Sequence, residues 1–217
     1  YKRQILIAMV TFLDAQTINR YGTTTANFLE IGIGSRATSM GDAYVAVAND
    51  VSSIYWNPAG LSHVTNSSAL FSIQPWLVDI DMMFAGGAFV VPSVGVIGLG
   101  ITHLDYGEMD VTNLEYQDGT GERFGASDVA ATFTFSRKIV SWFSFGSSMK
   151  YISSKIWHSS ASAFAVDLGV LVNTNFFSFT GKDKDGMNIG MSISNYGTRM
   201  KYDGIDNYQP IDISEFE

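Results

Sequence analysis

From residue 68 onward, large and small side chains alternate with a period of two, in segments of about ten residues. A period of two places successive side chains on opposite faces of a β-strand. The alternation predicts seven strands, at residues 68–75, 82–91, 94–105, 127–137, 142–153, 161–172 and 187–197. A tilted strand of about ten residues can cross a membrane, so the pattern fits a membrane β-barrel as well as a soluble all-β domain.

The two faces of the predicted strands differ consistently. The third strand sets Ile97, Leu99 and Ile101 against Gly98, Gly100 and Thr102. The fourth sets Val129, Ala131, Phe133 and Phe135 against Ala130, Thr132, Thr134 and Ser136. The sixth sets Phe164, Val166, Leu168 and Val170 against Ala163, Ala165, Asp167 and Gly169. A large apolar face suits contact with lipid, and a face of small residues suits a barrel whose lumen is filled by another segment.

Composition narrows the class of protein. Charged residues make up 16% of the chain, against about 25% in an average soluble domain. There is no Cys, which excludes disulfides and metal–thiolate sites. The net charge is −8 and no basic run exceeds two residues, so we expect no nucleic-acid partner. No stretch is long and apolar enough to predict a transmembrane helix.

The predicted connections differ in length. Those after the first, third and fifth strands are residues 76–81, 106–126 and 154–160, and those after the second, fourth and sixth are 92–93, 138–141 and 173–186. Bacterial barrels have short periplasmic turns and longer extracellular loops. We therefore expect the 106–126 loop to be extracellular, although 173–186 is long for a periplasmic turn.

Residues 1–15 have the pattern of a signal peptide. Lys2 and Arg3 form a basic start, residues 5–13 are apolar, and Ala15 is a small residue at the expected cleavage point. A buried N-terminal strand is the alternative. The signal-peptide interpretation predicts export.

Residues 16–67 have a different character. Apolar residues at helical spacing predict a helix over residues 35–49 with Ser35 as its N-cap, and they are Ala37, Met40, Ala43, Tyr44 and Val47. Pro58 restricts Asn57 to an extended conformation before a turn that Gly60 completes. The many small residues suit either a confined position inside a barrel or any tightly packed helix.

Residues 28–61 resemble the N-terminal signature of PorV/PorQ-type outer-membrane proteins, which are relatives of the FadL-like barrels. The residues that carry the resemblance are Gly34, Arg36, Met40, Gly41, Asn49, Asp50, Trp56, Asn57, Pro58, Ala59 and Gly60. Residues 145–152, 165–169 and 193–197 resemble successive strands of the same family.

The resemblance implies an all-β, antiparallel transmembrane barrel of about fourteen strands in a Gram-negative type of outer membrane. Residues 16–67 would form a helical plug inside the barrel, and residues 68–217 its N-terminal half. Seven strands cannot close a single-chain bacterial barrel, and an open edge in lipid leaves backbone groups unpaired. We therefore expect the sequence to be an N-terminal fragment.

Three functions are considered. The resemblance implies an accessory component of type IX protein secretion and surface attachment, with the lipid bilayer, a translocon, a sortase and cargo proteins as partners. The alternative is a FadL-like channel for hydrophobic small molecules. A soluble periplasmic β-protein with a structural role is the third. We favour secretion through the resemblance alone.

No motif indicates catalysis, a cofactor or a metal, and we expect no enzymatic activity. Gly32 and Gly34 followed by Asp50 imitate a dinucleotide-binding loop, but no β-α-β unit follows. The three histidines lack metal-ligand spacing, and residues 183–186 lack the terminal Glu of a calcium loop. The acidic residues of the 106–126 loop fit a solvated surface better than a calcium site. No Gly-x-Ser-x-Gly elbow is present.

Three polar residues are singled out. The amide of Asn57 is expected to cap its turn, with contact to cargo as the alternative. Lys150 and Asp167 fall on the small-residue face of neighbouring predicted strands, where they can form an ion pair in the lumen. A Lys facing lipid at the bilayer midplane would cost about 2–4 kcal/mol, which favours the inward orientation.

Overall fold

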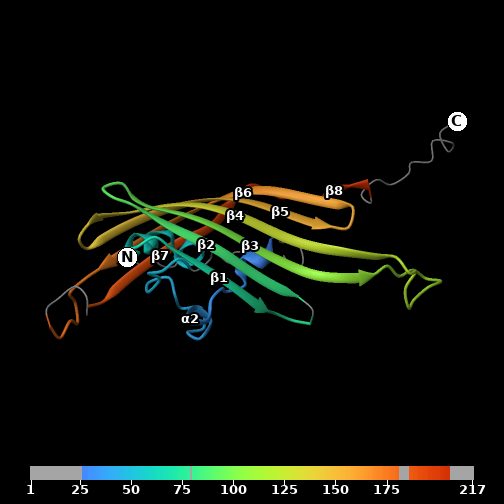
Figure 1. The fold of residues 1–217 in the computed structure, drawn as a ribbon, viewed down its shortest axis with the longest axis horizontal. Helices are drawn as coiled ribbons and strands as arrows, with labels where there is room; N and C mark the ends of the chain where they lie inside the picture. The colour runs from blue at the N-terminus through green and yellow to red at the C-terminus, as the bar shows by residue number, and fades with distance from the viewer. Residues whose placement is uncertain (1–25, 79, 181–185, 206–217) are drawn as a thin grey trace, which may run out of the picture.

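The computed structural model describes residues 26–78, 80–180 and 186–205. The predicted signal peptide lies outside these residues. Within these residues, eight strands form one antiparallel sheet in which β1 to β7 follow in sequence order (Figure 1). The strands are β1 (Ser68–Pro75), β2 (Asp81–Val91), β3 (Gly95–Asp110), β4 (Arg123–Val140), β5 (Phe143–Ile156), β6 (Ser159–Asn173), β7 (Asn188–Gly197) and β8 (Asp203–Gly204).

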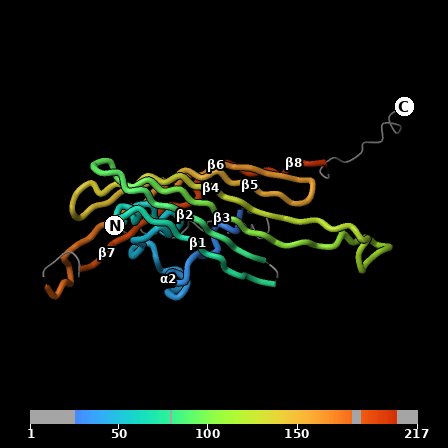
Figure 2. The backbone as a smooth tube through the Cα atoms, in the orientation of Figure 1, coloured from blue at the N-terminus to red at the C-terminus, as the bar shows by residue number. Residues whose placement is uncertain are grey.

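The seven predicted strands are present, but the middle ones are longer than predicted. The β3–β4 ladder continues past a bulge to the pair Asp110 and Arg123, so the connection is 111–122 and not 106–126. Ion pairs support this extension, because the Arg123 guanidinium lies 2.7 Å from Glu108 and 3.2 Å from Asp110. Figure 2 shows the extended β3–β4 hairpin projecting at one end of the sheet.

β8 is an addition that alternation did not predict. It pairs with Ser159 and Ser160 at the start of β6, whereas β7 pairs with the rest of the same strand. β7 and β8 therefore lie one after the other along β6 (Figures 1 and 2). A strand of two residues is too short to show a period.

A segment of residues 26–64, called here the N-terminal segment, covers one face of the sheet. We call this face the inner face and the opposite one the outer face. Phe28, Ile54 and Leu61 from the segment pack with Phe84 and Leu104 of the sheet in one buried cluster. On β4 and β6 the buried positions are those of the predicted small-residue faces, and the large apolar residues point outward.

The N-terminal segment is made of short pieces: η1 (Asn27–Glu30), α2 (Ser35–Thr38), α3 (Ser53–Trp56) and η2 (Pro58–His63). The helix predicted over 35–49 is wrong, since it ends at Thr38. Gly41 and Asp42 have φ angles of 61° and 65°, which a right-handed helix cannot contain. Gly34, not Ser35, is the N-cap residue.

Two of the apolar residues on which the predicted helix rested, Met40 and Val47, are 44% and 41% exposed. Among the described residues, no helix has the length and hydropathy needed to cross a membrane.

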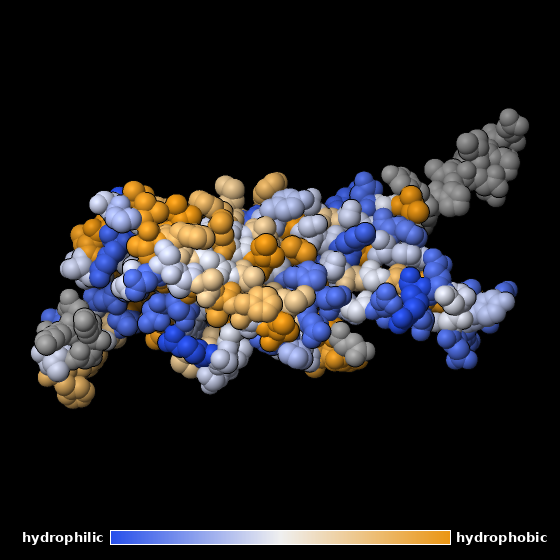
Figure 3. Space-filling view, in the orientation of Figure 1, coloured by the Kyte–Doolittle hydropathy of each residue, from blue (hydrophilic) through white to orange (hydrophobic). Residues whose placement is uncertain are grey.

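Figure 3 shows hydrophilic residues gathered at the projecting end of the β3–β4 hairpin, with hydrophobic residues over the body of the sheet.

Candidate functional site

Asn57 joins the N-terminal segment to the sheet. Its side chain is fully buried, and its Nδ2 donates to the carbonyl oxygens of Val45 at 2.8 Å and Val170 at 3.2 Å. Its Oδ1 accepts from the backbone N–H of Ala59 at 3.1 Å, which caps the first turn of η2. The Ser136 hydroxyl donates to the Ala59 carbonyl at 3.1 Å, so β4 holds the same turn. The amide of Asn57 is thus occupied by protein groups.

Glycines of the inner face allow this close approach. A Cβ on Gly169 would lie 2.1 Å from Asn57 Oδ1, and one on Gly146 would lie 2.3 Å from the carbonyl carbon of Pro58. Both glycines belong to strands beneath η2. The small-residue face read from the sequence is therefore shaped for this turn.

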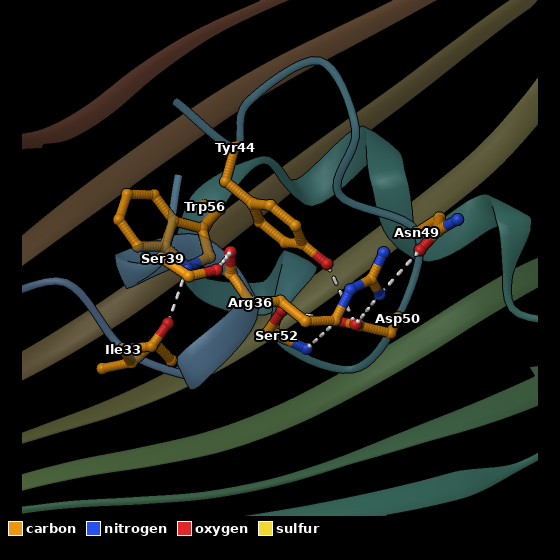
Figure 4. A network of polar contacts seen from close by, with 8 residues as sticks. All are labelled: Ile33, Arg36, Ser39, Tyr44, Asn49, Asp50, Ser52 and Trp56. Carbon is orange, nitrogen blue, oxygen red and sulfur yellow. Dashed lines mark hydrogen bonds and ion pairs between the residues drawn. The ribbon is translucent and has the colours of Figure 1, made fainter. Parts of the chain in front are cut away.

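A second group of contacts surrounds Asp50 (Figure 4). Arg36 Nη1 lies 2.8 Å from Asp50 Oδ2 and donates to Asn49 Oδ1 at 3.3 Å. The Tyr44 hydroxyl donates to the same carboxylate at 3.0 Å, and both the backbone N–H and the hydroxyl of Ser52 donate to its other oxygen. Arg36, Asn49 and Asp50 are three of the residues that carry the family resemblance. They thus meet across a loop of about a dozen residues.

The surroundings shift two pKa values in opposite directions. Burial acts to raise the pKa of Asp50, but the hydrogen bonds from Ser52 and Tyr44 and the charge of Arg36 together lower it. Burial, and then the Asp50 charge, raise the pKa of Tyr44. At neutral pH the pair is therefore a carboxylate and a neutral phenol, which is the state that the hydrogen bond requires.

Trp56 joins the part of the N-terminal segment before α2 to the loop that carries Tyr44. Its Nε1 donates to the Ile33 carbonyl at 3.1 Å, and its ring packs edge-on against Tyr44 with centroids 6.2 Å apart (Figure 4). Gly34 has a φ of 82°, which directs the chain into α2. Met40 lies outside these contacts and is partly exposed.

Lys150 and Asp167 form an ion pair on the inner face of the sheet. Lys150 Nζ lies 2.8 Å from Asp167 Oδ2, with side-chain exposures of 3% and 1%. Asn195 of β7 completes the group, because its Oδ1 accepts from Lys150 at 2.7 Å and its backbone N–H donates to Asp167 at 2.7 Å. The Tyr55 ring lies 5.9 Å from Lys150 Nζ, which links the group to the N-terminal segment.

Sequence reasoning missed Asn195 and Tyr55. Asn195 has a φ of 58° and lies where the β6–β7 register shifts, and neither property is visible in an alternation pattern. Sequence reasoning also missed Asp128, whose carboxylate accepts hydrogen bonds from the Tyr106 hydroxyl at 2.7 Å and from the Ser154 hydroxyl. The position of Asp128, two residues before Ala130 on the small-residue face of β4, was the available signal.

The arrangement connects and holds segments. Within the described ranges, no three His, Cys, Asp or Glu side chains lie close enough to hold a metal ion. The buried polar groups described above are satisfied mainly by one another and by backbone groups of the N-terminal segment and the sheet. The geometry therefore indicates a structural junction between segment and sheet.

Comparison with known proteins identifies the family. Residues 14–215 match the family model described as type IX secretion system protein PorV. Searches of curated proteins and of solved structures found no match. Because the model covers most of the sequence, the chain belongs to the PorV family of type IX secretion system proteins.

Proposed function

We propose that this sheet is part of the wall of an outer-membrane β-barrel, and that the protein is an accessory component of type IX secretion and surface attachment. The observation that carries the membrane part is a continuous apolar band on the outer face. The secretion part rests on membership of the PorV family.

The band crosses the sheet in register. One row of outer-face residues consists of Ala85, Ile101, Ala131, Tyr151 and Phe164, and the next of Gly87, Leu99, Phe133, Met149 and Val166. Leu99, Phe133 and Phe164 are 50%, 51% and 58% exposed. Soluble monomers rarely expose apolar patches of more than a few hundred Å². In a bilayer, lipid tails instead of water would surround the exposed side chains of the band.

The band ends in a polar row on one side and meets a single charged residue on the other. On one side the outer-face row is polar and consists of Asp81, Asp105, Ser127, Lys155 and Ser160. On the other side the outer-face row contains one charged residue, Arg137, beside Phe145 of β5 and Val170 of β6. The residues between Ser127 and Arg137 number nine, which matches the roughly 9–11 residues of a tilted membrane strand.

The N-terminal segment is then the plug. It covers the inner face, where the polar residues of the sheet are gathered, as lumen-facing residues are in outer-membrane barrels. We propose closure with about fourteen strands, since unpaired strand edges in lipid leave backbone hydrogen-bonding groups unsatisfied. The glycine-lined surface under Asn57 and Pro58 is filled by protein, which supports a structural role for the plug over a channel for hydrophobic molecules.

In secretion such a barrel receives exported proteins and passes them to the attachment machinery. We therefore propose a translocon barrel, a sortase and cargo proteins as partners, and a role without catalysis. The junctions around Asn57 and Asp50 would keep the plug in place while partners bind outside it.

The test uses the full-length protein in its own membrane. The protein should fractionate with outer membranes, migrate differently on gels before and after heating, and co-purify with translocon or sortase subunits identified by mass spectrometry. Its deletion should leave cargo in the periplasm. Recovery in the aqueous fraction without a heat-dependent shift would contradict the membrane role. Normal cargo attachment after deletion would contradict the secretion role.

A further inference from the structure

The two ends of the sheet differ in charge. At the end formed by the β3–β4 hairpin, the described residues include the acidic side chains Asp105, Glu108, Asp110, Glu115, Asp118 and Glu122. At the opposite end, where the β2–β3 and β4–β5 turns lie, β4 carries Arg137 and Lys138. In the described part of the chain, neither of these two cations makes an ion pair.

Arg137 and Lys138 line a cleft of about 380 Å³, called here the basic cleft. Its other walls are the β2–β3 turn around Ser93 and the end of η2 at Ser62. Among the described residues, none that lines it is acidic. Burial, followed by the charge of Lys138, lowers the pKa of His63, the last residue of η2.

The basic cleft lies at the border of the apolar band. Arg137 is the next outer-face residue after Phe135 on β4, and it pairs in register with Phe145 of β5. Ile139 and Trp142, just beyond it, are 56% and 53% exposed. In a bilayer, which this inference takes from the proposed function, such a border lies at the depth of the lipid headgroups.

We propose that the basic cleft binds the phosphate-bearing headgroup of an anionic phospholipid. Arg137, on the outer face, offers a planar pair of N–H donors for phosphate oxygens. Lys138, the next residue of β4, starts from the inner face and adds a second, compact charge to the same cleft. Ser93, a residue with a hydroxyl, lines the same cleft from the facing turn. The acyl chains of the bound lipid would run along the outer face past Phe135 and Phe145. Charge complementarity selects an anionic over a zwitterionic lipid.

The test uses the full-length protein in two kinds of vesicle, one of phosphatidylcholine alone and one of equal parts phosphatidylcholine and phosphatidylglycerol. After detergent extraction, native mass spectrometry measures which lipid stays bound. The wild-type protein should retain phosphatidylglycerol in preference. R137Q/K138Q should lower that retention roughly 20–30-fold, since a basic residue near an anionic membrane surface contributes about 1 kcal/mol, and 1.4 kcal/mol corresponds to a tenfold change.

Two controls separate charge from folding and position. R137K/K138R keeps both charges and should retain the lipid. K155Q removes a cation at the opposite border of the band and should also retain it. Equal retention of both lipids by the wild type, or unchanged retention by R137Q/K138Q, would overturn the inference. So would release of the lipid by inorganic phosphate, which would identify a site for the free ion.

Flotation of the vesicles distinguishes this inference from the proposed function. If the protein floats with phosphatidylcholine vesicles but shows no preference for phosphatidylglycerol, the membrane role stands and the headgroup site is refuted. If it floats with neither vesicle, the membrane role fails and the headgroup site fails with it.

Discussion

The amide of Asn57 makes three hydrogen bonds in a site without solvent exposure. Asn57→Ala leaves the carbonyls of Val45 and Val170 and the N–H of Ala59 without these partners. Unpaired buried polar groups cost about 1–3 kcal/mol each, and partial relaxation makes the sum smaller. We expect a loss of about 2–4 kcal/mol in the free energy of unfolding, measured by urea titration in detergent or vesicles.

Asn113→Ala is the matched control, because Asn113 accepts hydrogen bonds from Glu115 and Tyr116 in an exposed loop. It should change stability by no more than about 1 kcal/mol. Equal effects of the two substitutions would contradict the importance of the buried junction.

Gly169 tests the fit between sheet and segment. Gly169→Ala places a Cβ 2.1 Å from Asn57 Oδ1, so the turn must move, at a cost of about 1–3 kcal/mol. Gly87→Ala on the outer face meets only Phe89, at 3.4 Å, and should stay within about 0.5 kcal/mol of wild type. Thermal unfolding followed by the gel shift measures both. Similar midpoints for the two variants would mean that the turn is not held against β6.

The pKa of Asp50 is lower in the folded chain than its ordinary value of 3.8. A lowered carboxyl pKa stabilises the fold above the ordinary value, and the contribution disappears as the pH falls through the folded value. Protease cleavage within residues 36–50 should therefore increase below about pH 4. Asp50→Asn should already be cleaved faster at neutral pH and should lose this acid dependence. An unchanged acid dependence in the variant would assign the effect to another group.

At the level of single residues, alternation along a strand shows on which face of the sheet a side chain lies. The sequence therefore predicts a contact only between residues on the same face of neighbouring strands. Lys150 and Asp167 share the small-residue face of adjacent strands, so their meeting follows from alternation. Asn195 joins them only because the register of β7 shifts there, and a shift of register depends on the side chains that stabilise it.

Among the elements, β7 depends on buried side chains for its register. Its bulge at Asn195 is held by the buried pair of Lys150 and Asp167. Removing one partner of a buried ion pair costs about 3–5 kcal/mol, whereas replacing both by apolar residues can be nearly neutral. K150M should therefore destabilise strongly and raise hydrogen exchange in β7. K150M/D167L should recover much of the loss, and failure to recover would show that Asn195 needs the charged pair itself.

Strands were easier to predict than the short helices for a physical reason. The alternation of β4 and β6 is imposed by two different environments along the whole element, so it is visible in the sequence. The apolar spacing of residues 37–47 equally fits a series of turns. Gly41 and Asp42 decide between the two through their left-handed backbone, which is uncommon outside Gly and therefore difficult to anticipate at Asp42.

On the scale of the whole molecule, the apolar band and its borders separate a membrane wall from a soluble sheet. Phe133 lies in the middle of the band and is already half exposed. In a bilayer, Phe133→Lys should destabilise the folded protein by about 2–4 kcal/mol, because a Lys near the midplane faces hydrocarbon. Ser127→Lys, on the polar border row of the same strand, should cost about 0–1 kcal/mol.

The two substitutions add the same charge to the same face of β4, so their difference reports depth in the membrane. Urea-induced unfolding from phosphatidylcholine vesicles measures it. A soluble sheet predicts no such difference, since replacing an exposed Phe by Lys costs little in water and improves solubility. Equal stabilities for the two variants would therefore contradict the membrane assignment, even in a protein that co-purifies with the secretion machinery.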